Sequence, residues 1–147
     1  MAQTSQRLVM TSTRIEKLSL SDKTDSLMKP IPTKVHGLLD YTTGALFMAS
    51  PWLFDFADND KARQVALGTG VAVLGLSAFT DYEAGVVKKV PMTTHLTVDT
   101  LSGLLVAASP WLLGFAKRIV WPHLAFGILE VGAGLLTQPK PTSQKLI

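Results

Sequence analysis

The sequence contains no cysteine, so disulfide bonds, thiolate metal sites and cysteine nucleophiles are all excluded. Charged residues are scarce as well, at 17% of the 147 residues, against about 25% in ordinary soluble proteins. The net charge of +3 is modest and no basic stripe is interleaved with aromatic residues, which argues against nucleic-acid binding. The N-terminus lacks a short apolar run followed by a small-residue cleavage site, so we expect no cleavable signal peptide.

The few charges are segregated, and they leave four long apolar segments at residues 35–54, 62–80, 94–115 and 119–137. At about 1.5 Å per residue, a helix of about 20 residues covers the roughly 30 Å hydrocarbon core of a bilayer. A soluble four-helix bundle needs a charged outer face on every helix, whereas residues 65–79 contain no charged side chain. We therefore predict an all-α membrane protein with four transmembrane helices, the alternative being buried helices of a soluble domain.

Three polar segments flank and separate these spans: a leader (residues 1–34), a connection (81–93) and a tail (139–147). The leader is expected to be flexible or to lie at the membrane surface. Ten of the fourteen Lys and Arg residues lie in these segments, so the positive-inside rule predicts a multi-pass protein of the cell (inner) membrane with both termini cytoplasmic. At the opposite face, Trp52, Trp111 and Trp121 are expected to act as interfacial anchors.

The first span recurs 59 residues later in the chain. Residues 36–57 and 95–116 are identical at 11 of 22 positions. The same offset relates glycines of the following helices, Gly68 to Gly127 and Gly75 to Gly134. Each unit then holds two spans, so we predict two parallel helix-hairpin repeats, residues 35–80 and 94–138, related by an axis along the membrane normal.

Each repeat contains a Ser-Pro-Trp tripeptide, at residues 50–52 and 109–111, and each tripeptide follows a His-x3-Asp motif. In this duplicated arrangement, over residues 35–138, the chain resembles the SPW-repeat family of small bacterial and archaeal membrane proteins. The resemblance implies an integral membrane protein and no particular activity. The leader lies outside it.

Two polar stripes run along the first helix of each repeat. His36 and Asp40 lie one turn apart on one helical face, as do His95 and Asp99. Further hydroxyls extend the two stripes, from Thr43, Ser50, Ser102 and Ser109. A lipid-facing aspartate costs a few kcal/mol, so both stripes are expected to face inward and toward each other.

The His and Asp side chains admit a structural and a functional interpretation. In the first, they satisfy one another and fix the packing of the helices. In the second, two imidazoles and two carboxylates at one depth bind a divalent transition metal or relay protons. Axial ligation of one haem by His36 and His95 is the weakest alternative, because no other haem signal is present. The sequence pattern of His and Asp residues does not specify which metal would bind.

Glu130 is a further intramembrane charge, and its counterpart in the first repeat is Val71. We expect it near Ser102, within reach of Asp99 or His95. As the residue that breaks the symmetry, it is a hypothesis for a functional site.

Each Ser-Pro pair predicts either a kinked, continuing helix or a short interfacial helix that begins at the serine. In the kinked form, which we favour, the serine hydroxyl meets the carbonyl freed by proline. The seven-residue glycine spacing favours helix packing, within the bundle or between protomers. His123 follows Trp121-Pro122 and is expected to be solvated.

These features favour a small structural or accessory subunit that assembles with itself, as a homo-oligomer, or with a larger membrane complex. The alternative is binding or transport of protons, metal ions or a small solute at His36, Asp40, His95, Asp99 and Glu130. The sequence has no nucleophile–base motif and no cofactor fingerprint, so we expect neither an enzyme nor a cofactor.

Overall fold

The computed structural model describes Glu16, Leu20, Thr24 and residues 27–141, and the predictions for most of the leader and for the end of the tail lie outside these residues. Four long helices make up the described chain: α2 (Thr33–Leu53), α3 (Asp60–Phe79), α4 (Met92–Leu112) and α5 (Trp121–Leu136). Their ends differ from the predicted segments by at most three residues. The protein is therefore all-α, as predicted, in the part that the structure describes.

The ends of the helices follow from local chemistry. Pro32 and Pro91 directly precede α2 and α4, where a missing amide and a fixed φ cost nothing. The Asn59 side chain caps α3 by accepting a hydrogen bond from the amide of Ala62 at 3.0 Å. Pro122 lies in the first turn of α5, a favoured position for proline.

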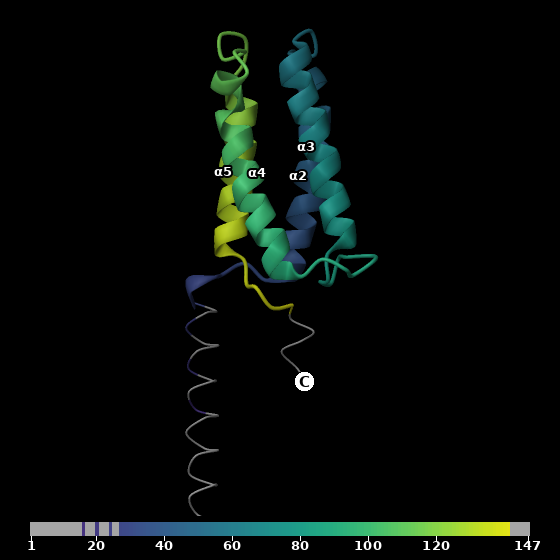
Figure 1. The fold of residues 1–147 in the computed structure, drawn as a ribbon, viewed down its shortest axis with the longest axis vertical. Coiled ribbons are helices and arrows are strands. Elements are labelled where there is room, and N and C mark those ends of the chain that lie inside the picture. Colours follow the sequence, from purple (N-terminus) through teal and green to yellow (C-terminus); the bar gives the residue numbers. More distant parts are fainter. Residues whose placement is uncertain (1–15, 17–19, 21–23, 25–26, 142–147) are drawn as a thin grey trace, which may run out of the picture.

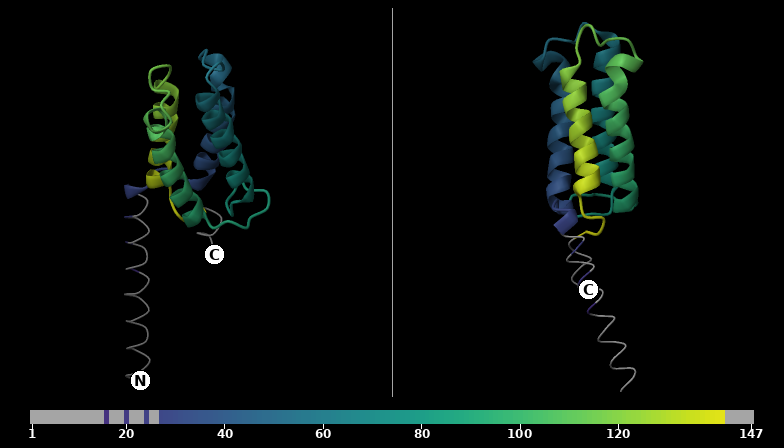
Figure 2. Two further views of the ribbon diagram at one scale, coloured as in Figure 1. Left: turned by 45° about the horizontal axis from the view of Figure 1, so that its top comes forward. Right: turned by 90° about the vertical axis from the view of Figure 1, so that its left-hand side faces the viewer.

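The helices form two antiparallel hairpins, α2 with α3 and α4 with α5, which stand side by side (Figures 1 and 2). Within each hairpin, glycines let the two backbones approach closely. A Cβ added at Gly70 would lie 2.7 Å from the carbonyl oxygen of Gly44, and one added at Gly103 would lie 2.7 Å from that of Gly127. Gly68 and Gly75, in contrast, border open space.

The glycine contacts correct the repeat register of the second helices. The bounds of α2 and α4 differ by 59 residues at both ends, but the packed glycines of α3 and α5, Gly70 and Gly127, differ by 57. Main-chain pairs agree, because Ile31 pairs with Thr137 and Val90 pairs with Thr80. The segment from Gly103 to Gly127 is thus two residues shorter than the segment from Gly44 to Gly70, and the expected equivalence of Gly68 with Gly127 and of Gly75 with Gly134 is wrong.

Each helix that contains Ser-Pro continues through the proline and ends two residues later. The hydroxyl of Ser50 donates to the carbonyl of Phe47, and that of Ser109 donates to the carbonyl of Val106, both at 2.7 Å. These are the carbonyls that proline leaves without an amide partner. The alternative of a separate interfacial helix beginning at serine is therefore wrong.

The two short turns, residues 54–59 and 113–120, each join the two helices of one hairpin. Both lie at the end of the bundle opposite the 80–91 connection, which we call the turn end (Figure 1). Here His123 is fully buried and lies against Phe47, Phe56 and Phe115. Its Nε2 lies 3.1 Å from the carbonyl oxygen of Ala62, and its Nδ1 has no partner among the described residues. The expectation that His123 is solvated is wrong, because the aromatic residues of both turns fold back over it.

One helix of the described chain, α3, is long and apolar enough to cross a bilayer by itself. Helix α5 is apolar but has only 16 residues, about 24 Å of helix.

Candidate functional site

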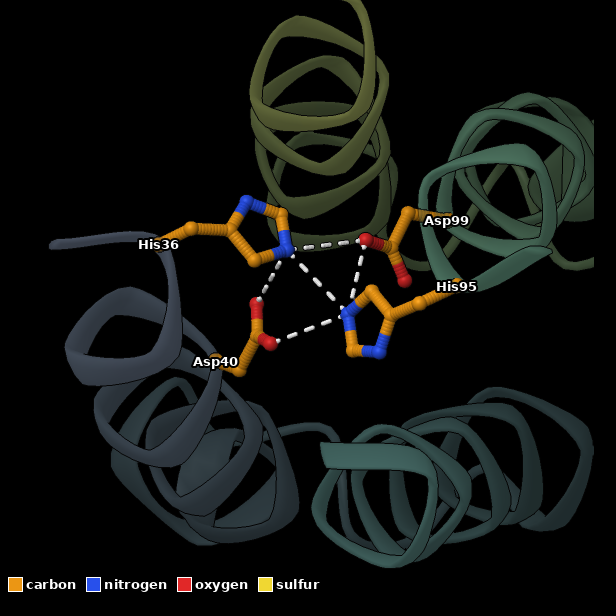
Figure 3. A group of neighbouring side chains, drawn as sticks. All are labelled: His36, Asp40, His95 and Asp99. Carbon is orange, nitrogen blue, oxygen red and sulfur yellow. Dashed lines mark hydrogen bonds and ion pairs between the residues drawn. The ribbon is translucent and has the colours of Figure 1, made fainter. Parts of the chain in front are cut away.

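His36 and Asp40 of α2 face His95 and Asp99 of α4 across the axis between the hairpins (Figure 3). This arrangement follows from the stripe spacing, because residues four apart share a helical face. All four side chains are buried, with exposed fractions of 0% for both histidines, 6% for Asp40 and 4% for Asp99. We refer to these four residues as the His/Asp cluster.

The two Nε2 atoms lie at the centre of the His/Asp cluster, 3.1 Å apart. The Nε2 of His36 lies 3.3 Å from Oδ1 of Asp40 and 3.1 Å from Oδ2 of Asp99. The Nε2 of His95 lies 3.1 Å from Oδ2 of Asp40 and 3.1 Å from Oδ2 of Asp99. Each imidazole therefore contacts the carboxylate of its own helix and that of the other hairpin.

Two threonines orient the imidazoles through Nδ1, the ring nitrogen that points away from the centre of the cluster. The Nδ1 of His36 lies 2.9 Å from Oγ1 of Thr137, and the Nδ1 of His95 lies 2.7 Å from Oγ1 of Thr80. The Thr80 hydroxyl donates its proton to the carbonyl of Leu76, so its oxygen accepts the Nδ1–H of His95. In neutral His95, Nε2 therefore presents its lone pair to the centre of the cluster.

Helix α3 and the following connection cover one side of the cluster. The hydroxyl of Ser77 donates to Oδ2 of Asp40 at 2.6 Å, and Tyr82 donates to the same oxygen at 3.5 Å. Burial and the nearby Asp40 raise the pKa of Tyr82 above its ordinary value of 10.0, so the phenol stays protonated. The Tyr82 ring packs closely over α2 because position 37 is a glycine.

Carboxylates and unprotonated imidazole nitrogens are all hydrogen-bond acceptors, and their convergence calls for a cation. One divalent metal or two protons would balance the two aspartates. In tetrahedral zinc geometry with bonds of about 2.0–2.1 Å, neighbouring ligand atoms lie about 3.3–3.4 Å apart. The His–His and His–Asp distances in the cluster, 3.1–3.3 Å, are close to this value, and the four ligand atoms all lie within 4.8 Å of one another. The residues present therefore offer one ion two nitrogen and two oxygen ligands.

The geometry does not fit haem. A porphyrin bound by His36 and His95 would have to lie between their Nε2 atoms, which are only 3.1 Å apart. The carboxylates of Asp40 and Asp99 already flank that gap.

The other candidate residues lie outside the cluster. Glu130 is buried beside α4 and accepts a hydrogen bond from Ser102 at 3.3 Å, near Gly103 as expected. Its hydrogen-bonding partner is thus Ser102 and neither Asp99 nor His95. The other hydroxyls of the two stripes donate hydrogen bonds to backbone carbonyls of their own helices. Thr43 donates to Leu39, Ser50 to Phe47, Ser102 to Asp99 and Ser109 to Val106.

Sequence reasoning missed the residues that support the cluster. Thr80 and Thr137 each follow the last residue of an apolar helix, but their spacing of 57 residues hid their equivalence at the offset of 59. Ser77 and Tyr82 have no counterpart in the second repeat that would have marked them. A comparison of the two helix ends, rather than of one fixed offset, would have found the threonines.

A family model described as the SPW repeat domain matches residues 34–137, more than two thirds of the chain. No curated protein and no solved structure matches the chain. The match spans all four described helices, both Ser-Pro-Trp tripeptides and the whole His/Asp cluster. The chain therefore belongs to the SPW repeat family of membrane-associated proteins.

Proposed function

We propose that all four helices span the membrane, with both termini on the cytoplasmic side. The family supports a membrane location, and among the described helices α3 has the length and apolarity to cross. In α2 and α4 the polar residues lower the mean hydropathy, but the four of the His/Asp cluster are buried and face inward. The large side chains on the outer faces are apolar, including Leu38, Leu101 and Ile128. The three tryptophans are exposed at the turn end, where they suit an interface with lipid headgroups.

We propose further that the His/Asp cluster binds one divalent transition metal, which clamps the two hairpins together. The observation that carries this proposal is the convergence of four buried acceptor groups, whose ligand atoms lie within 4.8 Å of one another. Two aspartates balance the charge of a divalent ion, which suits a site of low dielectric. Four protein ligands leave no open coordination position, as in structural rather than catalytic zinc sites. Thr80 and Thr137 hold the imidazoles from the second sphere.

Metal analysis of the protein purified from membranes tests this proposal. We expect about one equivalent of zinc or a similar ion, lost in the double variant His36→Gln/His95→Gln. Cobalt substitution should give the intense visible absorption of a tetrahedral site. The matched control Thr43→Val removes a polar group of the same stripe outside the cluster and should keep the metal. Absence of metal, together with no shift of the melting temperature on adding zinc or chelator, would contradict the proposal.

A second candidate is an accessory role through assembly with itself or with a larger membrane complex. It is favoured by the outer face of α3, where Ala72 is exposed and a Cβ added at Gly75 would meet no atom within 4 Å. Small residues of this kind let a neighbouring helix approach closely. Because the chain lacks cysteine, Ala72→Cys gives a unique thiol, which should form a disulfide dimer in membranes. Leu38→Cys on the outer face of α2 is the control, and equal cross-linking of both would contradict a specific interface.

A further inference from the structure

The two sides of the bundle differ at the turn end, where the hairpins face each other. Between α2 and α5, Phe47 stacks on Phe126 and Phe54 meets Trp121, both at 4.3 Å between ring centroids. These two aromatic pairs fill the space between the hairpins on that side.

The equivalent positions between α3 and α4 are occupied by smaller residues. With an offset of 59 for the first helices and 57 for the second, the Phe47–Phe126 pair corresponds to Val106 and Thr69. The Phe54–Trp121 pair corresponds to Leu113 and Gln64. All four of these smaller residues line one groove of about 420 Å³, whose surface is almost wholly apolar. The groove is thus the space that aromatic rings fill on the other side.

A basic side chain lies at the mouth of this groove. The Nζ of Lys61 donates to the carbonyl of Leu113, a lining residue, at 3.0 Å. The nearby arginines are already paired, Arg63 with Asp60 and Arg118 with Asp58. Lys61 makes no ion pair with a described residue, so its remaining N–H donors can contact a phosphate. If the four helices span the membrane as proposed above, Lys61 lies at the end of the bundle where headgroups would be.

We propose that this groove binds one acyl chain of an anionic phospholipid, with Lys61 contacting the phosphate. An acyl chain is apolar like the groove walls, and it reaches the groove laterally from the bilayer. The charge of Lys61 selects an anionic headgroup over a zwitterionic one. The proposal goes beyond the metal site, because it concerns the opposite end of the molecule and none of its lining residues belongs to the His/Asp cluster.

Native mass spectrometry of the full chain tests the proposal, after incubation in detergent with equimolar phosphatidylglycerol and phosphatidylcholine. We expect one retained phosphatidylglycerol per chain. Thr69→Phe, which places in the groove the residue found at the equivalent position 126, should abolish retention. Thr42→Phe makes the same change on an exposed face of α2 and should leave retention unchanged. Gln64→Trp provides a second, independent filling variant should Thr69→Phe fail to fold.

Lys61→Gln tests the headgroup contact separately. It should keep a bound lipid but lower the preference for phosphatidylglycerol about fivefold. Equal retention by the wild type and both filling variants would overturn the groove, and an unchanged preference in Lys61→Gln would overturn the role of Lys61. A dimer that holds no lipid and dissociates in Thr69→Phe would overturn the proposal in favour of a second copy as occupant.

Discussion

The two ends of the bundle join the same two hairpins by different means. At the connection end, polar groups from both repeats meet in nearly equivalent positions, with each imidazole between two carboxylates and backed by a threonine. At the turn end, aromatic side chains make the contact on one side and a groove replaces them on the other. Most buried polar groups need hydrogen-bond partners, which constrains both copies alike, whereas apolar contacts are not directional and tolerate loss on one side.

Of the changes considered, removing the charges of the His/Asp cluster should have the largest effect on stability. Asp40→Asn/Asp99→Asn leaves two buried imidazoles without their carboxylates, so we expect a loss of roughly 3 kcal/mol or more in the free energy of unfolding. Denaturant or thermal unfolding in detergent measures it. Asp60→Asn, at an exposed position, serves as the control. Unfolding unchanged from the wild type would mean that the cluster does not hold the hairpins together.

The close glycine contact within the second hairpin should be the next most sensitive feature. A Cβ at Gly127 would lie 2.5 Å from the amide nitrogen of Ala107, so Gly127→Ala must push α4 and α5 apart. We expect a loss of about 1–3 kcal/mol in stability. Gly75→Ala, where the Cβ meets open space, should be neutral or slightly stabilising, because alanine is the better helix former. Equal effects of the two changes on the melting temperature would contradict this packing.

Removing a single second-sphere hydroxyl should have a comparable effect on stability. Thr80→Val leaves the buried Nδ1–H of His95 without an acceptor, at a cost of about 1–3 kcal/mol. If the cluster binds metal, the affinity should also fall, about 10- to 100-fold. Thr97→Val removes a similar hydroxyl from an exposed helical face and is the control. A metal affinity that stays constant in Thr80→Val would show that Thr80 does not orient the ligand.

The ion pair between Arg118 and Asp58, which links the two turns, should contribute least to stability. The hydrogen bond from Arg118 lowers the pKa of Asp58 below its ordinary value of 3.8. The pair therefore stabilises the fold fully above about pH 4, and this contribution is lost as the pH falls through the lowered pKa. Arg118→Gln should remove that pH dependence and change the melting temperature only slightly, because both side chains are exposed. A melting profile of the variant that matches the wild type between pH 2 and pH 5 would exclude the linkage.

Much of the architecture was predictable because it depends on local patterns. The segregation of charge marked four helices to within three residues of their ends, and the offset of 59 relates α2 to α4 in the structure. The i, i+4 spacing of His36 and Asp40 placed them on one face, and the cost of charge in lipid turned that face inward. The serine bond to the carbonyl freed by proline was also predictable, because both groups belong to one helical turn.

The remaining features depend on contacts between segments far apart in the chain. Neither Thr80 nor Thr137 is close in sequence to the histidine that it contacts on the other hairpin. The burial of His123 required the turn residues Phe56 and Phe115 to fold back over it. The offset between the repeats changes from 59 in the first helices to 57 in the second because Gly70 and Gly127 are the residues that pack against their partner helices.

The sequence by itself determined the helices, the duplicated polar stripe and the family, since each follows from residues close together or repeated in order. Only the tertiary structure decided that the four His and Asp side chains meet at bonding distance and that Glu130 bonds instead to Ser102. It also decided that one side of the turn end is filled and the other open. The reason is that rotation and tilt of one hairpin against the other are set by side-chain packing over the whole interface, which no local pattern specifies.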